Sequence, residues 1–293
     1  MVSPTGAHAP ARIGRGPDAG GRATTTEPAA RRRTGETGHG PVSLGIDIGS
    51  TNTKVALVRC GDEATELAVS SFPTPDRPSD LVRRTLDAVS ALLADAPEHP
   101  AAVGVASMAE TGAPLDADGH ELSPLIRWNR SPAAATPGAQ AAGILDGTEI
   151  FERIGPDAFF RRTGVPPLPK APLAVWHALR RDEPALWRRT HRWAGVADLV
   201  VHALTGAFVT DHTLAGRTGA YPLPGEGEAL PAGFDPDLLA LVDLGPSRLS
   251  RVAQPGDAAG AVTAKASRRT GLAEGVPVYV AGHDHAARVA PPR

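Results

Sequence analysis

The chain has 293 residues, of which 41% are hydrophobic and 21% are charged, so it can bury the core of one or two globular domains. Its formal net charge of −2 provides no basic excess to neutralise phosphates, and we expect no nucleic-acid partner. The single cysteine, Cys60, excludes an internal disulfide framework and favours a reducing, cytoplasmic location. No apolar run approaches the ~18 residues of a membrane-spanning helix, so we expect no membrane association. The sequence carries no indication of the oligomeric state.

Residues 1–41 differ in composition from the rest of the chain. They contain mainly Gly, Pro, Thr and Ala, with six arginines against three acidic residues and few apolar side chains. A segment that cannot bury apolar surface does not fold by itself. They also lack the apolar stretch of a secretory signal. We therefore predict a disordered leader over 1–41 and an ordered domain from Val42 onward.

The stretch Leu44–Val58 reads LGIDIGSTNTKVALV and predicts a β-hairpin. Its apolar residues alternate up to Ile48, small polar residues form a turn, and Thr53–Val58 returns as a strand. Backbone amides and hydroxyls at such a turn can hold phosphate oxygens, while the carboxylate of Asp47 can hold hydrated Mg²⁺. An ordinary edge turn is the alternative interpretation. The hairpin lacks the GxxxxGK[ST] pattern of a Walker loop. The candidate phosphate-binding residues are Gly49, Ser50, Thr51, Asn52 and Lys54.

The elements that follow predict a mixed sheet. Glu66–Phe72 reads as a third strand, Ser79 as the cap of an amphipathic helix, and Ala101–Ala106 as a buried strand. Three strands, a helix and another strand do not fit a purely doubly wound α/β fold. They resemble the α/β ribonuclease H-like fold of actin-like ATPases and sugar kinases. Further helices are predicted at Ile150–Phe160, Ala171–Leu179, Asp237–Val242 and Ala264–Gly271, and one is expected to start at 182–184. Ala197–Leu204 is an apolar stretch closed by Thr205-Gly206, and a strand is predicted at Val276–Ala281.

Four segments in the same order and spacing resemble the FGGY family of carbohydrate kinases. The first is GIDIGSTNTKVALV, and the second is Trp176–Val209, which contains an LTG signature. The third is TDHTLAGRTGAYPL, at Thr210–Leu223. The fourth is Gly260–Ala287, which contains AGHDHAA. The resemblance covers the first of the family's two domains, over 42–287, and the motifs of the second domain are not found. It therefore predicts an N-terminal kinase domain followed by a truncated tail at 288–293.

The resemblance implies transfer of the ATP γ-phosphate to a hydroxyl of a small sugar or polyol, with Mg²⁺. It makes Asp284 the general base that takes the proton of the attacking hydroxyl, and Asp47 the acid on the magnesium side. From the residues alone, Asp284 reads equally as the cap of a short helix, Asp47 as a strand-end acid, and Lys54 as a solvated strand residue. We interpret His283 and His285 as local hydrogen-bonding residues, because no third metal ligand is evident beside them.

Two candidate substrate-binding residues depart from the family pattern around them. Glu110 corresponds to the acid of an Arg-Glu pair that binds polyol hydroxyls in glycerol kinases, but Ala109 stands where the arginine would be. The resemblance therefore favours a polyol-binding acid without glycerol specificity. Trp128 begins a Trp-Asn-Arg segment that matches the family's Trp-x-Asp-x-Arg imperfectly, because the aspartate is missing. Trp128 is either a wall of the sugar site or a packed core residue.

Three functions remain open on the sequence. A carbohydrate kinase is the leading interpretation, with little activity expected from the first domain alone. A catalytically silent truncated product or a sugar-binding regulatory module is the second. An actin-like ATPase is the third; it fits the hairpin but not the LTG and TD segments. The identity of the sugar depends on a few cleft side chains and is not readable from the sequence.

Overall fold

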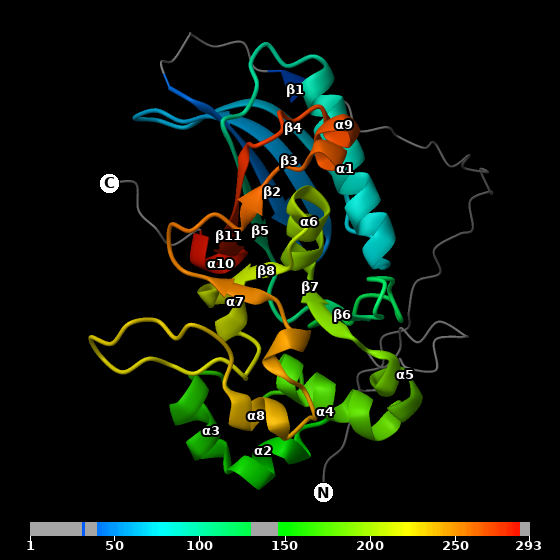
Figure 1. Ribbon diagram of the computed structural model, residues 1–293. Coiled ribbons are helices and arrows are strands. Elements are labelled where there is room, and N and C mark those ends of the chain that lie inside the picture. Colours follow the sequence, from blue (N-terminus) through cyan, green and yellow to red (C-terminus); the bar gives the residue numbers. More distant parts are fainter. Residues whose placement is uncertain (1–30, 33–39, 130–145, 288–293) are drawn as a thin grey trace, which may run out of the picture.

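The computed structural model describes residues 31–32, 40–129 and 146–287. Its upper part in Figure 1 is a twisted sheet with helices on one side, and its lower part is a group of short helices. The large sheet has the order β1-β4-β3-β2-β5-β11-β10. Its strands are β1 (Arg31–Arg32), β2 (Val42–Ile48), β3 (Asn52–Arg59), β4 (Thr65–Pro73), β5 (Ala102–Ser107), β10 (Gly260–Ala261) and β11 (Pro277–His283).

The sheet is mixed, as predicted from the order of its elements. Strand β2 pairs antiparallel with β3 and parallel with β5, and β5 in turn pairs parallel with β11. Strands β2, β3 and β4 lie within one or two residues of the bounds predicted for the first three strands. Most of the leader predicted over 1–41 falls outside the described residues. Within it, Arg31–Arg32 form β1, which pairs antiparallel with β4.

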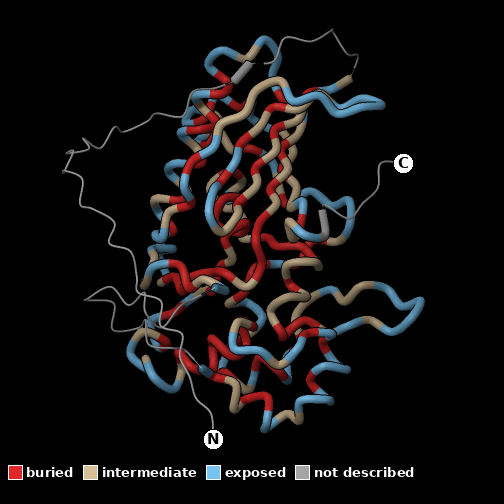
Figure 2. The backbone as a smooth tube through the Cα atoms, turned by 180° about the vertical axis from the view of Figure 1, so that it is seen from behind, coloured by how far each residue is buried: buried red, intermediate tan, exposed pale blue. Residues whose placement is uncertain are grey.

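Three helices cover one face of the sheet: α1 (Pro78–Ala94), α6 (Val196–Thr205) and α9 (Ala264–Thr270) (Figure 1). The alternation of β2 turns Leu44, Ile46 and Ile48 toward them, and all three side chains are buried. Figure 2, which colours each residue by its burial, shows buried residues along the central strands. The other face carries Gly45 and Asp47 and is only partly buried.

The predicted cap of α1 is wrong. The helix begins at Pro78, and its N-cap residue Arg77 makes no side-chain capping bond. Ser79 instead donates from its amide and its hydroxyl to the carboxylate of Glu121, at 2.6 and 3.2 Å. Glu121 also pairs with Arg77 at 2.6 Å. Proline at the first position needs no amide partner, which removes one of the donors that a capping side chain would satisfy.

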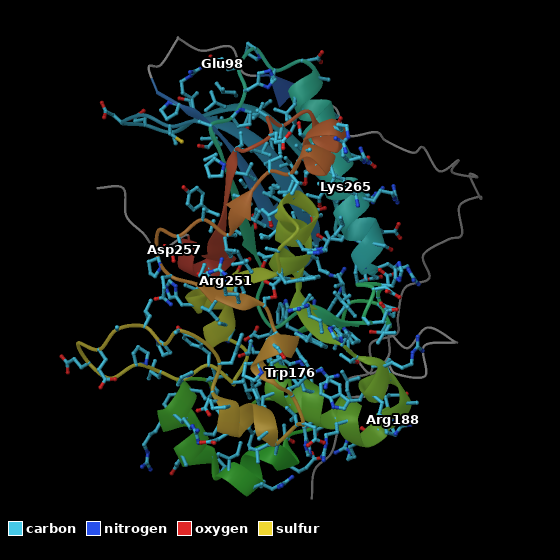
Figure 3. All side chains as sticks on the ribbon, in the orientation of Figure 1. Glu98, Trp176, Arg188, Arg251, Asp257 and Lys265 are labelled. Atoms are coloured by element: carbon cyan, nitrogen blue, oxygen red, sulfur yellow. The ribbon has the colours of Figure 1, made fainter. Side chains whose placement is uncertain are left out.

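A second hydrophobic core lies in the lower part. It centres on Trp176, which is fully buried, and Figure 3 shows this side chain among the lower helices. The helix predicted at Ile150–Phe160 is in fact two, broken at Gly155, whose φ of 88° a helix cannot contain. The helices of this part are α2 (Glu149–Ile154), α3 (Pro156–Thr163), α4 (Pro172–Asp182), α5 (Pro184–Arg189) and α8 (Pro236–Ala240).

Short elements join the two parts. The sequence did not predict the pair β6 (Gly112–Leu115) and β7 (Arg192–Gly195), nor the pair β8 (Val209–Asp211) and β9 (Arg251–Ala253). Two short helices, α7 (His212–Gly216) and α10 (Asp284–Ala287), follow β8 and β11. None of the helices in the described ranges combines the length and hydropathy that crossing a bilayer needs.

Candidate active site

The predicted site residues come together at one edge of the large sheet. The parallel strands β2, β5 and β11 end in register, with Ile48 beside Ser107 and Ser107 beside His283. Asp47 therefore lies at the end of β2, and Asp284 directly follows β11. Glu110 lies three residues beyond β5, which separates these two strands. Ligands of open α/β sheets bind at the carboxyl ends of parallel strands, so this edge is the candidate active site.

The predicted hairpin forms, and its phosphate-binding role stays a prediction. Strands β2 and β3 are joined by a turn at Gly49–Asn52, closed by a 3.1 Å hydrogen bond from the Gly49 amide to the Asn52 carbonyl. Ser50 is half-buried, while Thr51 and Asn52 are exposed at the tip. Lys54 is exposed and lies directly opposite Asp47 in the antiparallel pair, so their side chains share one face of the sheet. Both the phosphate-binding and the solvated interpretation of Lys54 are compatible with this position.

Glu110 is held by two cations that sequence reasoning did not find. Its side chain is only 6% exposed and its Oε1 accepts from Arg217, whose Nε lies 3.0 Å away and whose Nη2 is a second donor. The ammonium of Lys170 lies 3.3 Å from the same oxygen. Among the described residues, these hydrogen bonds and ion pairs of the carboxylate all fall on Oε1.

The backbone of Glu110 is unusual as well. Its φ is 58°, one of two positive values among the non-glycine residues that the structure describes. A non-glycine residue in this region is held there by its surroundings at a cost of about 1–3 kcal/mol, and such residues cluster at functional sites. The residue with this backbone conformation is the one whose carboxylate pairs with Arg217 and Lys170.

Trp128 is exposed beside this carboxylate rather than packed in the core. The residue is 39% exposed, and the Lys170 ammonium lies 5.4 Å from the centroid of its ring. Its amide donates to the Thr111 hydroxyl at 3.2 Å, next to Glu110 in the chain. The packed-core alternative for Trp128 is therefore wrong. The exposed ring forms a wall next to Glu110 and Lys170, which is the arrangement that can stack on a sugar face.

Asp284 begins α10 and is largely enclosed, with 17% of its side chain exposed. Its Oδ1 accepts from the His285 amide at 2.8 Å and lies 3.2 Å from Nε2 of His283. The first contact joins adjacent residues, whereas a capping side chain accepts from an amide two or three positions further along the helix, so it is not the capping bond of the sequence alternative. Both contacts fall on Oδ1, and the catalytic role of Asp284 stays a prediction.

His283, which precedes Asp284 in the chain, is partly buried. Burial lowers the pKa of His283 below its ordinary 6.5, a shift that the negative charge of Asp284 opposes. The charges of Arg217 and Glu110 also act on this imidazole, so the Glu110 cluster and the end of β11 share one electrostatic environment. The ligand atoms of His283, Asp284 and His285 lie within 4.8 Å of one another, so Asp284 itself is the third potential metal ligand that the sequence did not reveal.

The TD segment supports the end of β11. Asp211 caps α7, accepting from the amides of Thr213 and Leu214. The Thr213 hydroxyl contacts the Asp211 carboxylate at 2.9 Å and accepts from the His283 amide at 2.8 Å. Strand β11 has a register irregularity between Val280 and Gly282, immediately before this contact. A local bulge re-aims the residues that follow it, and here those residues include Asp284.

A cavity of about 50 Å³ lies beneath Glu110, between the end of β5 and the lower helices. It is lined by Ser107, Trp176 and the buried acid Asp198, among others. Burial raises the pKa of Asp198, and its Oδ2 accepts from the Ser250 hydroxyl at 2.7 Å and from the Gly195 amide at 2.9 Å. These bonds fix the start of α6, so we interpret Asp198 as structural.

Comparison with known proteins gives this site a family. A model of the N-terminal domain of the FGGY family of carbohydrate kinases matches residues 42–289. L-fuculokinase of Escherichia coli is 27% identical over 254 residues, covering 83% of this chain and 50% of that protein. Xylulose kinase of Streptomyces coelicolor is 30% identical over 233 residues, covering 76% and 44%. The crystal structure of xylulose kinase from Rhodospirillum rubrum superposes with a TM-score of 0.69 at 28% identity, covering 83% and 49%.

The sheet order and this superposition define a domain of the actin-like ATPase fold, of the kind found in sugar kinases. The chain belongs to the FGGY family of carbohydrate kinases. It spans about half the length of the relatives that it matches.

Proposed function

We propose that this chain provides the sugar-binding and first phosphate-binding half of an ATP-dependent carbohydrate kinase, which transfers the ATP γ-phosphate to a hydroxyl of a small sugar or polyol. One observation carries the proposal. Three acids with different surroundings meet at the carboxyl edge of β2, β5 and β11: Asp47 beside the hairpin, Glu110 in its cation cluster, and Asp284.

The donor set around the hairpin fits a magnesium–nucleotide phosphate group. The turn Gly49–Asn52 offers amides and the hydroxyls of Ser50 and Thr51, and Asp47 precedes it on the partly buried face of β2. Mg²⁺ is commonly held by one or two carboxylates together with phosphates and waters. Bound there, the ion would neutralise phosphate charge. Lys54, opposite Asp47, adds a positive charge on the same face.

Each remaining residue has a role that its position allows. Glu110 accepts a substrate hydroxyl at Oε2, while the outer donors of Arg217 and Lys170 bind substrate oxygens. Trp128 covers one face of the ligand. Asp284 takes the proton of the attacking hydroxyl at Oδ2, with His283 holding Oδ1. Phosphoryl transfer depends mainly on such positioning and charge neutralisation, with one acceptor for the hydroxyl proton.

The test begins with binding. The chain is screened by thermal shift against ketoses, aldoses, polyols and sugar acids, because a ligand that binds only the folded state raises the melting temperature. We expect a hit among these classes that Glu110→Gln weakens. Formation of ADP with that ligand is then measured in the protein containing this domain. Binding without any ATP consumption would favour the sugar-binding module, and ATP hydrolysis indifferent to every sugar would favour the actin-like ATPase.

A further inference from the structure

Each of the four carbonyl oxygens of the turn Gly49–Asn52 accepts a hydrogen bond, either from another residue of the turn or from a residue outside it. The donors outside the turn are Thr74 and Arg127. In chain order, the four bonds are Thr74 Oγ1 to Gly49 at 2.8 Å, Arg127 Nη1 to Ser50 at 2.7 Å, the Thr74 amide to Thr51 at 2.9 Å, and the Gly49 amide to Asn52 at 3.1 Å.

These bonds fix where the amides of the turn point. In a trans peptide the carbonyl and the following N–H lie in one plane and point in opposite directions. No peptide bond in the described residues is cis. The amide that follows the Gly49 carbonyl is that of Ser50, and the amide that follows the Ser50 carbonyl is that of Thr51. Both therefore point away from Thr74 and Arg127. Successive outward amides form a concave surface that favours anions.

Arg127 ties this turn to the end of β4. Besides Ser50, its Nη2 donates to the carbonyls of Thr74 and Pro75 at 2.9 and 3.1 Å, and its Nε pairs with Asp76 at 2.9 Å. Its side chain is 17% exposed. A planar guanidinium can meet several acceptors in fixed directions, which an ammonium group cannot do. The side chain thus links two consecutive loops at the candidate phosphate site.

The backbone that carries Arg127 is itself anchored. Ile126 exchanges both backbone hydrogen bonds with Gly112, at 2.8 and 3.3 Å. Trp128 donates to the Thr111 hydroxyl. The residues on both sides of Arg127 are therefore hydrogen-bonded to the segment that follows Glu110. Through Arg127, the position of the turn depends on the position of this substrate-side segment.

We propose that Arg127 is a positioning residue for phosphate binding: it holds the Ser50 carbonyl inward so that the amides of Ser50 and Thr51 face the phosphates of the nucleotide. This inference rests on the proposed kinase function. Arg127 touches neither phosphate nor sugar in this role; it acts through the turn.

The experiment compares Arg127→Met, Arg127→Lys and a matched control, Arg59→Met. Arg59 lies at the other end of β3, is 16% exposed, and likewise bonds a backbone carbonyl, that of Gly40, and a carboxylate, that of Glu98. Two properties of the chain are measured. One is hydrogen exchange of the peptide containing Gly49–Asn52, and the other is the dissociation constant for magnesium tripolyphosphate, a probe of the phosphate site without the base.

We expect Arg127→Met to accelerate exchange in the turn and to weaken tripolyphosphate binding about tenfold, which corresponds to about 1.4 kcal/mol. Arg127→Lys should recover part of both losses and also serves if Arg127→Met does not fold. Arg59→Met should change neither property. In the active kinase, Arg127→Met should raise KM for ATP more than KM for the sugar.

Two failures are distinguishable. Wild-type affinity and wild-type exchange in Arg127→Met would overturn the role of Arg127 and leave the proposed function standing. Absence of tripolyphosphate binding by the unmodified chain would overturn the phosphate site in the proposed function, and this inference with it. An equal loss in Arg59→Met would show a general loss of stability and would also overturn the positioning role.

Discussion

Thr213 Oγ1 accepts a 2.8 Å hydrogen bond from the amide of His283, 70 residues further along the chain. The same hydroxyl donates to Asp211, the cap of α7. One side chain thus connects the TD segment, a signature of uncertain purpose when read from the sequence, to the strand that delivers Asp284. The direction in which Asp284 leaves β11 depends on this contact.

Replacing Thr213 by valine should therefore destabilise the chain. Valine keeps the shape but leaves the part-buried His283 amide without an acceptor, which costs about 1–3 kcal/mol. Thr213→Ser retains the hydroxyl and should restore most of this stability. Urea unfolding of the three proteins measures the difference. If valine and serine behave alike, the hydroxyl does not support the strand.

A second prediction concerns Gly282, whose φ is 92°. A Cβ placed there would lie 2.7 Å from Thr213 Oγ1 and 3.2 Å from Asp211 Oδ2, so Gly282→Ala should be destabilising through both conformation and collision. Gly275→Ala is the matched control, because Gly275 has a φ of 87° but open space around its Cβ. The control should lose about 1–2 kcal/mol from conformation alone. Equal losses in the two variants would show that the close approach is absent.

The sequence predicted local features of this fold better than long-range ones. The alternation in Leu44–Val58 and the turn chemistry at Gly49–Asn52 are local signals, and the hairpin formed as predicted. The strands β6 and β7 carry only four residues each, and each is stabilised by its partner about 80 residues away rather than by its own pattern. Propensity reasoning has no access to such pairing.

The same division applies to the site. Asp47 and Asp284 follow apolar strands, so their placement at a sheet edge could be predicted. Glu110 could be predicted only through the family resemblance, and its cation could not. Ala109 occupies the adjacent position where an arginine was expected, whereas Arg217 reaches the same carboxylate from 107 residues away. An ion pair of that sequence separation exists only once α7, which Arg217 follows, has packed against β11 and β8.

The Glu110 cluster yields a third prediction. Glu110→Gln removes the charge that holds Arg217 and Lys170, and we expect it to weaken binding of the sugar identified by screening by about tenfold or more, as the loss of a charged hydrogen bond costs about 1.5–3 kcal/mol. Glu121→Gln is the control: its side chain is 9% exposed and it pairs with Arg77 away from the site. Isothermal titration measures both affinities. Equal affinity in Glu110→Gln and the unmodified chain would remove Glu110 from the substrate site.

Stability should also depend on pH through the partly buried His202. Burial lowers the pKa of His202 below its ordinary 6.5, assisted by the charges of Arg192 and of Lys265 on α9 (Figure 3). The folded state then binds fewer protons than the unfolded state, so its stability is complete above about pH 6.5 and falls as pH decreases through the folded pKa. His202→Gln should flatten this slope in urea unfolding measured between about pH 7.5 and about pH 5, a range that spans the ordinary pKa of histidine. An unchanged slope would assign the effect to other groups.

The last prediction separates the two acids at the sheet edge. In the active kinase, Asp284→Asn should lower kcat by about 100- to 10,000-fold, the usual range for removing a general base, while leaving sugar affinity nearly unchanged. The amide keeps the shape and still hydrogen-bonds a hydroxyl, but it cannot take its proton. Asp47→Asn should instead raise the Mg²⁺ concentration needed for half-maximal rate, because it removes charge from the metal side. Near-normal turnover in Asp284→Asn would identify another base. Collapse of sugar affinity in the same variant would make Asp284 a binding residue whose contact with the hydroxyl, rather than its basicity, matters.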